Sequence, residues 1–367
     1  MESSPFKFRS LSTAKDTIVD MRKDANRMIG KNIDKEINKE MQESKDSNLD
    51  FKIISDEVEK LILRTKEQSE HMIILATRRG LSPSTICGDC QNIVTCNSCS
   101  SPVILHKLKD NEEKNFFLCH HCGERSSSEE YCKVCGSWKL KAMGIGIDLV
   151  EEEIKNKFPD ISIFRIDSDT IHDDKSAHAV IQKYKSKPGS ILIGTEMILQ
   201  YIHDKVENSV IISLDSLLSL PDFRVQDKIF SMILRMRSLS TRDFIVQTRK
   251  TDEKVFEYGM KGNMSDFYRK TIEERKKFNY PPFFILIKLT LEGKKDNIIK
   301  QMEETQTILE PYEVDVFPAF THTIRGNFVL HGLIRIAKEK WPDVLLIEKI
   351  RSLSPAVMVK VDPETLL

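Results

Sequence analysis

Residues 85–99 read TICGDCQNIVTCNSC, and residues 119–135 read CHHCGERSSSEEYCKVC. All eight cysteines of the 367-residue chain lie in these two stretches, as four Cys-x-x-Cys knuckles. Cysteine pairs at this spacing are typical of tetrahedral zinc sites, in which each ion takes two knuckles. The sequence therefore predicts a module that binds two zinc ions in the middle of the chain.

Two other uses of the cysteines fit the pattern less well. Disulfide scaffolds are small secreted domains whose cysteines are spread through the fold, whereas these crowd into the 49 residues from Cys87 to Cys135. A redox centre uses a single Cys-x-x-Cys motif near a strand-to-helix junction, so four copies would be redundant. We therefore interpret the knuckles as metal ligands.

The knuckles can be paired in three ways. Joining neighbours leaves five residues between the first two knuckles, and a crossed arrangement leaves loops of 28 and 32 residues. The nested arrangement encloses 19 residues, 100–118, which fits the spacing of about 15 to 20 residues in zinc ribbons and whose apolar pattern predicts a hairpin. Spacing thus favours the nested pairing. The outer ligands would be Cys87, Cys90, Cys132 and Cys135, and the inner ligands Cys96, Cys99, Cys119 and Cys122.

Four cysteines per ion leave no open coordination position, so both zinc ions would be structural. His106, His120 and His121 lie nearby and could each replace a cysteine, although eight cysteines already fill eight ligand positions. Residues 85–140 carry six basic and seven acidic side chains, so the charge of this insert does not indicate phosphate binding. A folding staple, a surface for protein partners and a role in separating DNA strands all stay open.

Outside the cysteines, short Ile, Val and Leu runs alternate with helical patterns, as is typical of a parallel sheet covered on both faces. We predict one α/β domain, residues 1–84 and 141–250, into which the cysteine module 85–140 is inserted. Its strands are predicted at 17–21, 72–76, 161–166, 190–194, 210–214 and 244–247, and its helices at 52–70, 149–158, 177–184 and 224–236. In the first of these helices, Ile54, Val58, Leu61 and Ile62 form one apolar stripe.

From about residue 265 the pattern changes. A polar helix is followed by a strand at 283–291, a helix at 297–309, strands at 314–317 and 328–336, a helix at 343–351 and a strand at 356–361. This βαββαβ order is typical of a ferredoxin-like fold. We therefore predict a separate C-terminal α+β domain over residues 251–367.

The charge balance limits the ways in which the chain could meet nucleic acid or a membrane. Its 56 basic and 56 acidic residues cancel, so nucleic-acid contact would need a local patch. No apolar run approaches the roughly 18 residues that a membrane span needs, and no secretion signal is evident. We expect a soluble cytoplasmic protein without membrane contact.

The motifs around the cysteines resemble the PriA family of bacterial replication-restart helicases, also called primosomal protein N′. The resemblance extends over nearly the whole chain and matches the C-terminal half of the family. It includes IVDMR at 18–22, RRG at 78–80, the eight cysteines in order, RIDSDT at 165–170, GTEM at 194–197, LPDFR at 220–224, YPPF at 280–283 and VDP at 361–363.

The resemblance implies a fold and a function. The parts that flank the cysteines would be the second RecA-like helicase lobe, and the zinc pairing would be the nested one. Family members unwind forked DNA 3′ to 5′ with ATP and recruit the primosome through partners that include single-stranded DNA-binding protein. DNA and these proteins are the partners that the resemblance implies.

This sequence departs from the family at the nucleotide site. It has no G-x-x-x-x-G-K-[ST] phosphate cradle, and we expect the first lobe with its Walker residues to be missing. In place of the family's Q-V-x-G-R-A-G-R, residues 235–242 read RMRSLSTR, where Arg242 alone keeps an arginine position. The arginine-rich segment of the C-terminal domain becomes RGNFV at 325–329. Catalytic residues are therefore not predicted.

Three hypotheses follow. The preferred one is a zinc-stabilised PriA-type protein that binds DNA or primosome partners and has no ATPase activity of its own. A second is one subunit of a split helicase with a separately encoded first lobe, in which Gly194, Thr195 and Arg242 would sit across an ATP molecule. A third is a non-catalytic protein-interaction scaffold.

Overall fold

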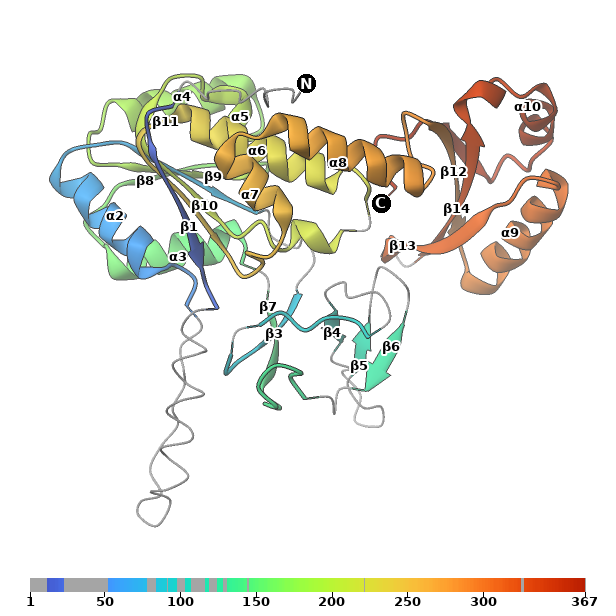
Figure 1. Ribbon diagram of the computed structural model, residues 1–367, viewed down its shortest axis with the longest axis horizontal. Coiled ribbons are helices and arrows are strands. Elements are labelled where there is room, and N and C mark those ends of the chain that lie inside the picture. Colours follow the sequence, from blue (N-terminus) through green and yellow to red (C-terminus); the bar gives the residue numbers. More distant parts are fainter. Residues whose placement is uncertain are drawn as a thin grey trace, which may run out of the picture. The chain divides into compact units, whose positions relative to one another are not determined.

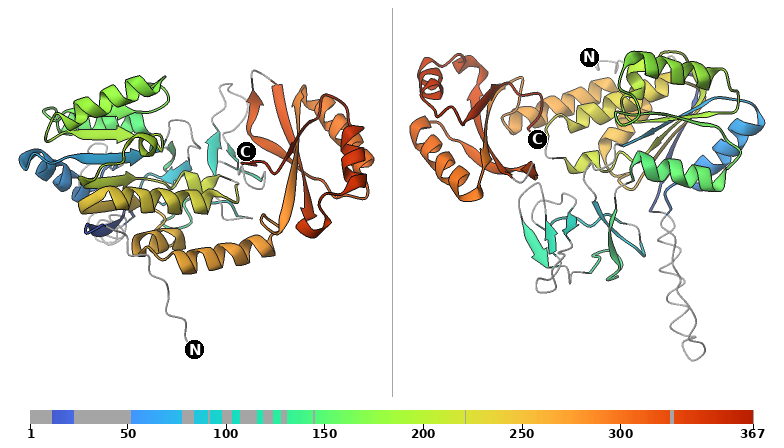
Figure 2. Two further views of the ribbon diagram at one scale, coloured as in Figure 1. Left: turned by 90° about the horizontal axis from the view of Figure 1, so that it is seen from above. Right: turned by 180° about the vertical axis from the view of Figure 1, so that it is seen from behind.

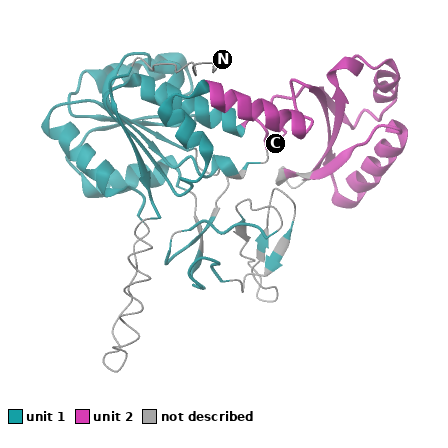
Figure 3. Cartoon of the chain, viewed as in Figure 1, with its two compact units in different colours: residues 1–220, 225–264 teal, residues 221–224, 265–367 magenta. Residues whose placement is uncertain are grey.

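The computed structural model divides the chain into two compact units, residues 1–220 with 225–264 and residues 221–224 with 265–367 (Figure 3). It describes residues 12–22, 52–77, 84–90, 92–97, 103–106, 116–118, 124–127, 131–143, 145–220, 222–324 and 327–366. Each unit is described below by itself.

A six-stranded parallel sheet forms the centre of the first unit (Figure 1). Its strands stand in the order β1-β11-β10-β2-β9-β8. They are β1 (Lys15–Asp20), β2 (Met72–Ala76), β8 (Ile163–Ile166), β9 (Ile191–Gly194), β10 (Val206–Ile212) and β11 (Ser240–Thr248). The predicted α/β class with a parallel sheet is confirmed, and the predicted strand at 72–76 has these bounds in the structure.

Helices cover both faces of this sheet (Figure 2). On one face α2 (Asp56–Glu67) and α3 (Ile147–Lys157) bury their apolar stripes against alternate strand residues such as Met72 and Ile74. The predicted apolar stripe is buried there: Val58, Leu61 and Ile62 belong to α2, and Ile54 lies just before its cap. Ile73 and Leu75 point to the other face and are equally buried. That face carries α4 (Asp174–Lys185), α5 (Ile198–Tyr201) and α6 (Val225–Leu239).

The sequence analysis did not predict α7 (Lys254–Lys261), which packs against α6. A Cβ at Gly259 would lie 2.7 Å from Ile233 Cγ2, so glycine is what permits this close approach of the two helices. Only eight residues and an internal glycine make a weak helix signal. Because α7 packs on α6, the first unit continues to residue 264, whereas the sequence analysis ended the α/β domain at 250.

The cysteine segment leaves the sheet after β2 and returns at α3, where Thr77 Oγ1 donates to the Ile145 carbonyl at 2.9 Å. At its base β3 (Ser84–Cys87) pairs antiparallel with β7 (Leu140–Met143). A second, three-stranded sheet contains β4 (Ile104–His106), β5 (Phe116–Leu118) and β6 (Arg125–Ser127). The predicted hairpin is confirmed by the antiparallel pairing of β4 with β5, and Phe117 is buried.

The second unit contains an antiparallel sheet in the order β13-β14-β12-β15, with helices on one face. Along the chain its elements follow the predicted βαββαβ order, after the polar helix α8 (Met264–Lys277). They are β12 (Phe284–Gly293), α9 (Lys295–Leu309), β13 (Asp315–Ile324), β14 (Asn327–Ala337), α10 (Val344–Arg351) and β15 (Met358–Val361). Ile287, Leu289 and Ile334 pack with Ile298 and Leu346 of the helices in its core.

Among the helices of the described residues, none is both long and apolar enough to cross a bilayer.

Candidate functional site

A cavity of about 340 Å³ lies at the carboxyl ends of β2, β9 and β10. The chain passes from the end of β2 toward α3 on one face of the sheet, and from the end of the neighbouring β10 toward α6 on the other face. Adjacent parallel strands whose connections diverge in this way leave a crevice that binds ligands in open α/β sheets. The cavity occupies this position, which makes it the candidate binding site of the first unit.

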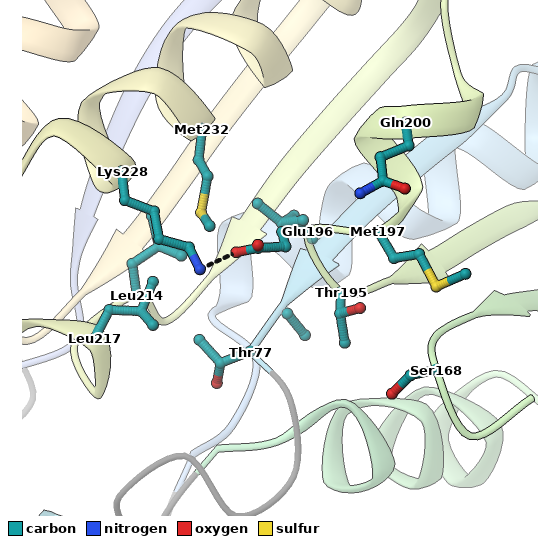
Figure 4. A pocket seen from close by; sticks show the side chains of 12 residues that line it. Thr77, Ser168, Thr195, Glu196, Met197, Gln200, Leu214, Leu217, Lys228 and Met232 are labelled. Atoms are coloured by element: carbon teal, nitrogen blue, oxygen red, sulfur yellow. Dashed lines mark ion pairs between the residues drawn. The ribbon is translucent and has the colours of Figure 1, made fainter. Parts of the chain in front are cut away.

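Hydroxyl groups and one ion pair supply the polar part of the cavity wall. Thr77, Ser168 and Thr195 each follow the end of a strand, and all three line the cavity. Lys228 of α6 points at Glu196, with Nζ to Oε2 at 2.5 Å (Figure 4). Both charged side chains are about half exposed, at 45% and 50%. The three hydroxyl groups and the Lys228 ammonium can donate hydrogen bonds to an anionic ligand, whereas the Glu196 carboxylate can only accept them. The remaining wall is mostly apolar and consists of Leu75, Ala76, Met197, Gln200, Leu214, Leu217 and Met232.

Thr195 lines this cavity and Gly194 directly precedes it, but the reason for the glycine is packing. A Cβ at Gly194 would lie 2.8 Å from both the Ile166 carbonyl oxygen and Ile198 Cβ. Thr195 is largely buried and lines the cavity, and its N–H donates to the Ile166 carbonyl at 3.2 Å. Of the two residues, Thr195 is therefore the one whose side chain is placed to contact a ligand.

Arg242 is not brought together with Gly194 and Thr195. It lies near the start of β11, whereas Gly194 ends β9, and the strand registers place Gly194 level with Val246 through Leu75 and Ile211. Four residues of a parallel strand span roughly 13 Å. Arg242 thus lies toward the amino edge of the sheet, where its guanidinium pairs with Glu70 and donates to Gln68 Oε1 at 2.7 Å.

Three residues of the cavity wall, Thr77, Ser168 and Lys228, are absent from the sequence-based prediction. The rule that ligands meet the carboxyl ends of parallel strands could have identified Thr77, because it directly follows a predicted buried strand. Lys228 gives no such signal, since its position depends on how α6 packs. Arg165, in the RIDSDT stretch at 165–170, is engaged elsewhere: its guanidinium donates to Asp148 at 2.7 Å and Glu151 at 2.8 Å and also contacts Asp167.

Four cysteine sulfurs form a second candidate site in the insert. Cys87, Cys90, Cys132 and Cys135 have their Sγ atoms within 4.8 Å of one another. Cys87 lies 3.6 Å from Cys135 and Cys90 lies 3.4 Å from Cys132, sulfur to sulfur. Ligands about 2.3 Å from a tetrahedral zinc ion stand about 3.8 Å apart. The outer two knuckles are thus grouped at close to the spacing that zinc requires, as the nested pairing predicts for them.

Local backbone structure holds these knuckles. The pairing of β3 with β7 places Cys87 opposite Leu140, and Gly88 N donates to the Lys139 carbonyl at 2.6 Å. After the fourth knuckle, Cys132–Cys135, Gly136 adopts the left-handed φ of 72°, and its N–H donates to the Cys132 carbonyl at 2.7 Å. Glycine is favoured at this turn because side chains rarely adopt that conformation.

The sulfur chemistry also suits a cation. A hydrogen bond from Cys90 lowers the pKa of the Cys87 thiol to about 4, while the same contact raises the pKa of Cys90. Burial raises the pKa of Cys135 to about 11. Sulfurs this close cannot all be thiolates without a compensating positive charge, and a bound divalent cation deprotonates its thiol ligands. The four residues therefore fit a zinc ion.

The predicted inner site falls mostly outside the described residues, which include Cys96 but not Cys99, Cys119 or Cys122. Cys96 is buried, and its Sγ lies 2.9 Å from Glu124 Oε2. Within the described ranges, the outer set is the one group of clustered cysteines, histidines or carboxylates with metal-binding geometry. Arg325 and Gly326 of the C-terminal segment also lie outside the described residues.

Several known replication restart proteins are similar to this chain. No family model matches it. It is 31% identical to the replication restart protein PriA of Borreliella burgdorferi over 254 residues, which are 68% of this chain and 37% of that protein. With PriA of Chlamydia pneumoniae the identity is 29% over 339 residues, 85% of this chain and 44% of the relative.

PriA of Thermotoga maritima is 26% identical over 319 residues, 83% of this chain and 42% of the relative. The chain spans about two fifths of the length of these curated relatives. Over that length, the chain is a homologue of the replication restart protein PriA.

Proposed function

We propose that this chain binds DNA in a PriA-type replication-restart system and does not hydrolyse ATP by itself. In this proposal residues 1–84 and 141–250 act as a degenerate second RecA-like lobe, residues 85–140 as a two-zinc insert, and residues 251–367 as a ferredoxin-like domain. The strand orders of the two sheets support these fold assignments. Primosome proteins and single-stranded DNA-binding protein are its proposed protein partners.

The observation that carries the proposal is the cavity at the carboxyl edge of the parallel sheet. Serine, threonine and lysine side chains are common partners of DNA phosphates, and Thr77, Thr195 and Lys228 gather at this edge. Glu196 holds the Lys228 ammonium at one side of the opening. A phosphate that displaces this carboxylate would gain the lysine charge, so the cavity would take the sugar-phosphate backbone of a single strand.

The absence of ATPase activity in the isolated chain is proposed from the sequence and from Arg242. No Walker A pattern occurs in the sequence, and phosphoryl transfer needs such a phosphate cradle with a magnesium-binding carboxylate. Arg242 is paired with Glu70 of its own unit. The Arg242 side chain is 48% exposed, and this exposure is the observation that favours the split-helicase alternative.

Fluorescence anisotropy with labelled single-stranded and forked DNA tests the binding proposal on the zinc-loaded full chain. Lys228→Met should weaken binding about tenfold and reduce the slope of log affinity against log salt by about one. Lys183→Met is the matched control, because Lys183 is exposed on α4 away from the cavity. Equal affinity of Lys228→Met and wild type would reject this site, and no binding at low salt would favour the scaffold alternative.

ATP hydrolysis should stay at background with forked DNA. Hydrolysis by the purified chain would contradict the proposal. If a separately encoded first lobe restores unwinding, Arg242→Ala should abolish that activity. Unwinding that survives this substitution would reject Arg242 as the residue that stabilises the transferred phosphate.

The proposed metal content is two zinc ions per chain. The outer set rests on the grouped sulfurs of Cys87, Cys90, Cys132 and Cys135, and the inner set rests on cysteine spacing and on the resemblance to the PriA family. Both would stabilise the fold and leave the chemistry of the cavity unchanged.

A further inference from the structure

In the sequence, a short segment between Leu217 and Lys228, two residues that line the cavity, belongs to the other unit. Asp222–Arg224, here called the strap, follows the 3₁₀ turn η1 (Leu217–Ser219) and precedes α6, both of which are parts of the first unit. The strap itself packs as part of the second unit (Figure 3). The chain therefore enters the second unit for a few residues and returns to begin α6 at Val225.

Aromatic and cationic side chains hold the strap in the second unit. The ring of Phe223 stacks on Tyr280 with a centroid distance of 4.8 Å and an interplanar angle of 10°. The guanidinium carbons of Arg224 and Arg275 lie 5.2 and 5.3 Å from the centroid of Phe223. Stacked rings and a cation over a ring face both attract. Phe223 is therefore fixed by groups of the second unit as well as by its own neighbour.

Hydrogen bonds to Asp222 fix the other side of the strap. Its Oδ2 accepts from Thr365 Oγ1 at 2.5 Å and from Leu366 N at 3.4 Å, and its Oδ1 accepts from Arg224 N at 2.9 Å. Leu366 is buried and packs with Leu286 of β12 and Leu333 of β14 in the sheet of the second unit. The strap and the segment around Thr365 thus hold each other against one face of that sheet.

The strap is joined directly to residues that form the cavity. Leu217 precedes it, and Lys228 and Met232 of α6 follow it; all three line the cavity. Val225, the first residue of α6, follows Arg224 directly and is buried. Residues of the cavity wall therefore lie within a few positions, along the chain, of a segment whose contacts are made in the second unit.

We propose that the strap couples the cavity of the first unit to the second unit. Release of Phe223 from Tyr280 loosens the first turn of α6 and with it the side of the cavity that carries Lys228. By linkage, a ligand that tightens this side of the cavity also stabilises the strap on the second unit. The coupling exists without a ligand, so its test is independent of the proposed DNA binding.

Hydrogen exchange on the zinc-loaded, ligand-free full chain tests the coupling. The substitutions are made in the second unit, as Tyr280→Ala or Thr365→Val, and amide exchange is read in α6 of the first unit. In Tyr280→Ala, exchange at residues 225–230 should accelerate by between about twofold and tenfold, the range expected for loss of a stacked ring. Exchange in α2, which lies far from the strap in the sequence, should stay at its wild-type rate.

Phe278→Ala is the matched control, because Phe278 is an exposed aromatic residue two positions before Tyr280 and takes no part in the stack. The Phe278→Ala variant should leave the rate of amide exchange in α6 unchanged. Thr365→Val changes one hydroxyl group and serves if Tyr280→Ala does not fold. The proposal is overturned if either folded variant speeds exchange at residues 362–366 while residues 225–230 exchange as in the wild type, or if Phe278→Ala has the same effect as Tyr280→Ala.

Discussion

Arg242 and Glu70 form an ion pair at the amino edge of the parallel sheet, where β11 begins and the chain enters β2. Glu70 is only 6% exposed, and its other oxygen accepts from Asn208 Nδ2 at 2.8 Å. Asn208 in turn accepts from Arg64 Nη2 at 2.9 Å. Arg242, which the resemblance assigned to an arginine-finger position, is thus part of a network that joins β10, β11 and the residue Glu70 just before β2.

Removal of Glu70 should therefore destabilise the first unit more than removal of Arg242. Glu70→Ala leaves the buried Asn208 amide without this acceptor and Arg242 without its carboxylate, which we expect to cost about 2 to 3 kcal/mol. Arg242→Ala should cost about 1 kcal/mol, because this side chain is half exposed. Urea unfolding at neutral pH measures both values.

Arg269→Ala is the control for this comparison, since Arg269 pairs with Asp266 on an exposed surface of α8. It should change the free energy of unfolding by less than about 0.5 kcal/mol. A larger loss of stability in Arg242→Ala than in Glu70→Ala would show that the network is organised around the arginine.

Zinc counting on paired cysteine variants separates the three pairings. Cys87→Ser with Cys132→Ser changes the first and fourth knuckles. The nested pairing predicts that this double variant retains one zinc ion, whereas the neighbour and crossed pairings predict that it retains none. A colorimetric zinc assay on the purified, denatured chain gives the number.

The complementary variant Cys87→Ser with Cys96→Ser changes the first and second knuckles. Under the nested pairing it should lose both zinc ions, and loss of metal should unfold the insert because metal binding and folding are one equilibrium in such modules. One zinc ion per wild-type chain would instead mean that the inner cysteines do not bind metal.

Local patterns in the sequence predicted the elements better than their contacts. The strand at 72–76 was predicted to the residue because five apolar side chains are followed by Thr77. The helix predicted from residue 52 begins at Asp56 instead, because Ser55 caps it by accepting from Val58 N at 3.3 Å. Such signals lie within a few residues of one another, which is why sequence reasoning can use them.

Contacts between distant residues had no comparable signal. Glu70, Asn208 and Arg242 meet only because β2, β10 and β11 are neighbours in one register. The same register separates Arg242 from Gly194 and Thr195, which the sequence analysis had placed around one nucleotide. Cysteine spacing was more informative, because a metal ion restricts which knuckles can approach; the grouping of the outer four follows from it.

The second unit should lose stability in mild acid through His331. Burial, together with the nearby charge of Lys288, lowers the pKa of this imidazole to about 4, and its Nδ1 lies 2.9 Å from Thr290 Oγ1. The folded protein keeps the ring neutral while the unfolded chain protonates it below about pH 6.5. The contribution of the neutral His331 ring to stability is therefore fully present above pH 6.5. As the pH falls toward 4, the free energy of unfolding decreases by up to about 3 kcal/mol.

His331→Gln should remove most of this pH dependence. Trp341 packs against the core of the second unit, so its fluorescence in a Trp138→Phe background reports urea unfolding of that unit at pH 7, 6 and 5. A slope between pH 6.5 and 5 that is the same with glutamine at position 331 would assign the pH dependence to another group.

Gly194 offers a test that separates packing from ligand binding. Gly194→Ala places a methyl group 2.8 Å from the Ile166 carbonyl oxygen and from Ile198 Cβ. These atoms belong to β8 and α5 and cannot move independently, so the substitution should cost about 1 to 3 kcal/mol. Thr195→Val, which removes a hydroxyl group from the cavity wall, should instead weaken DNA binding with less effect on stability.

Gly293→Ala is the control, because its Cβ would meet only the Ile298 methyl group at 3.2 Å. Thermal unfolding and DNA anisotropy are measured for all three variants. If Gly194→Ala keeps wild-type stability and loses DNA binding, the backbone at Gly194 contacts the ligand, and packing does not explain the glycine.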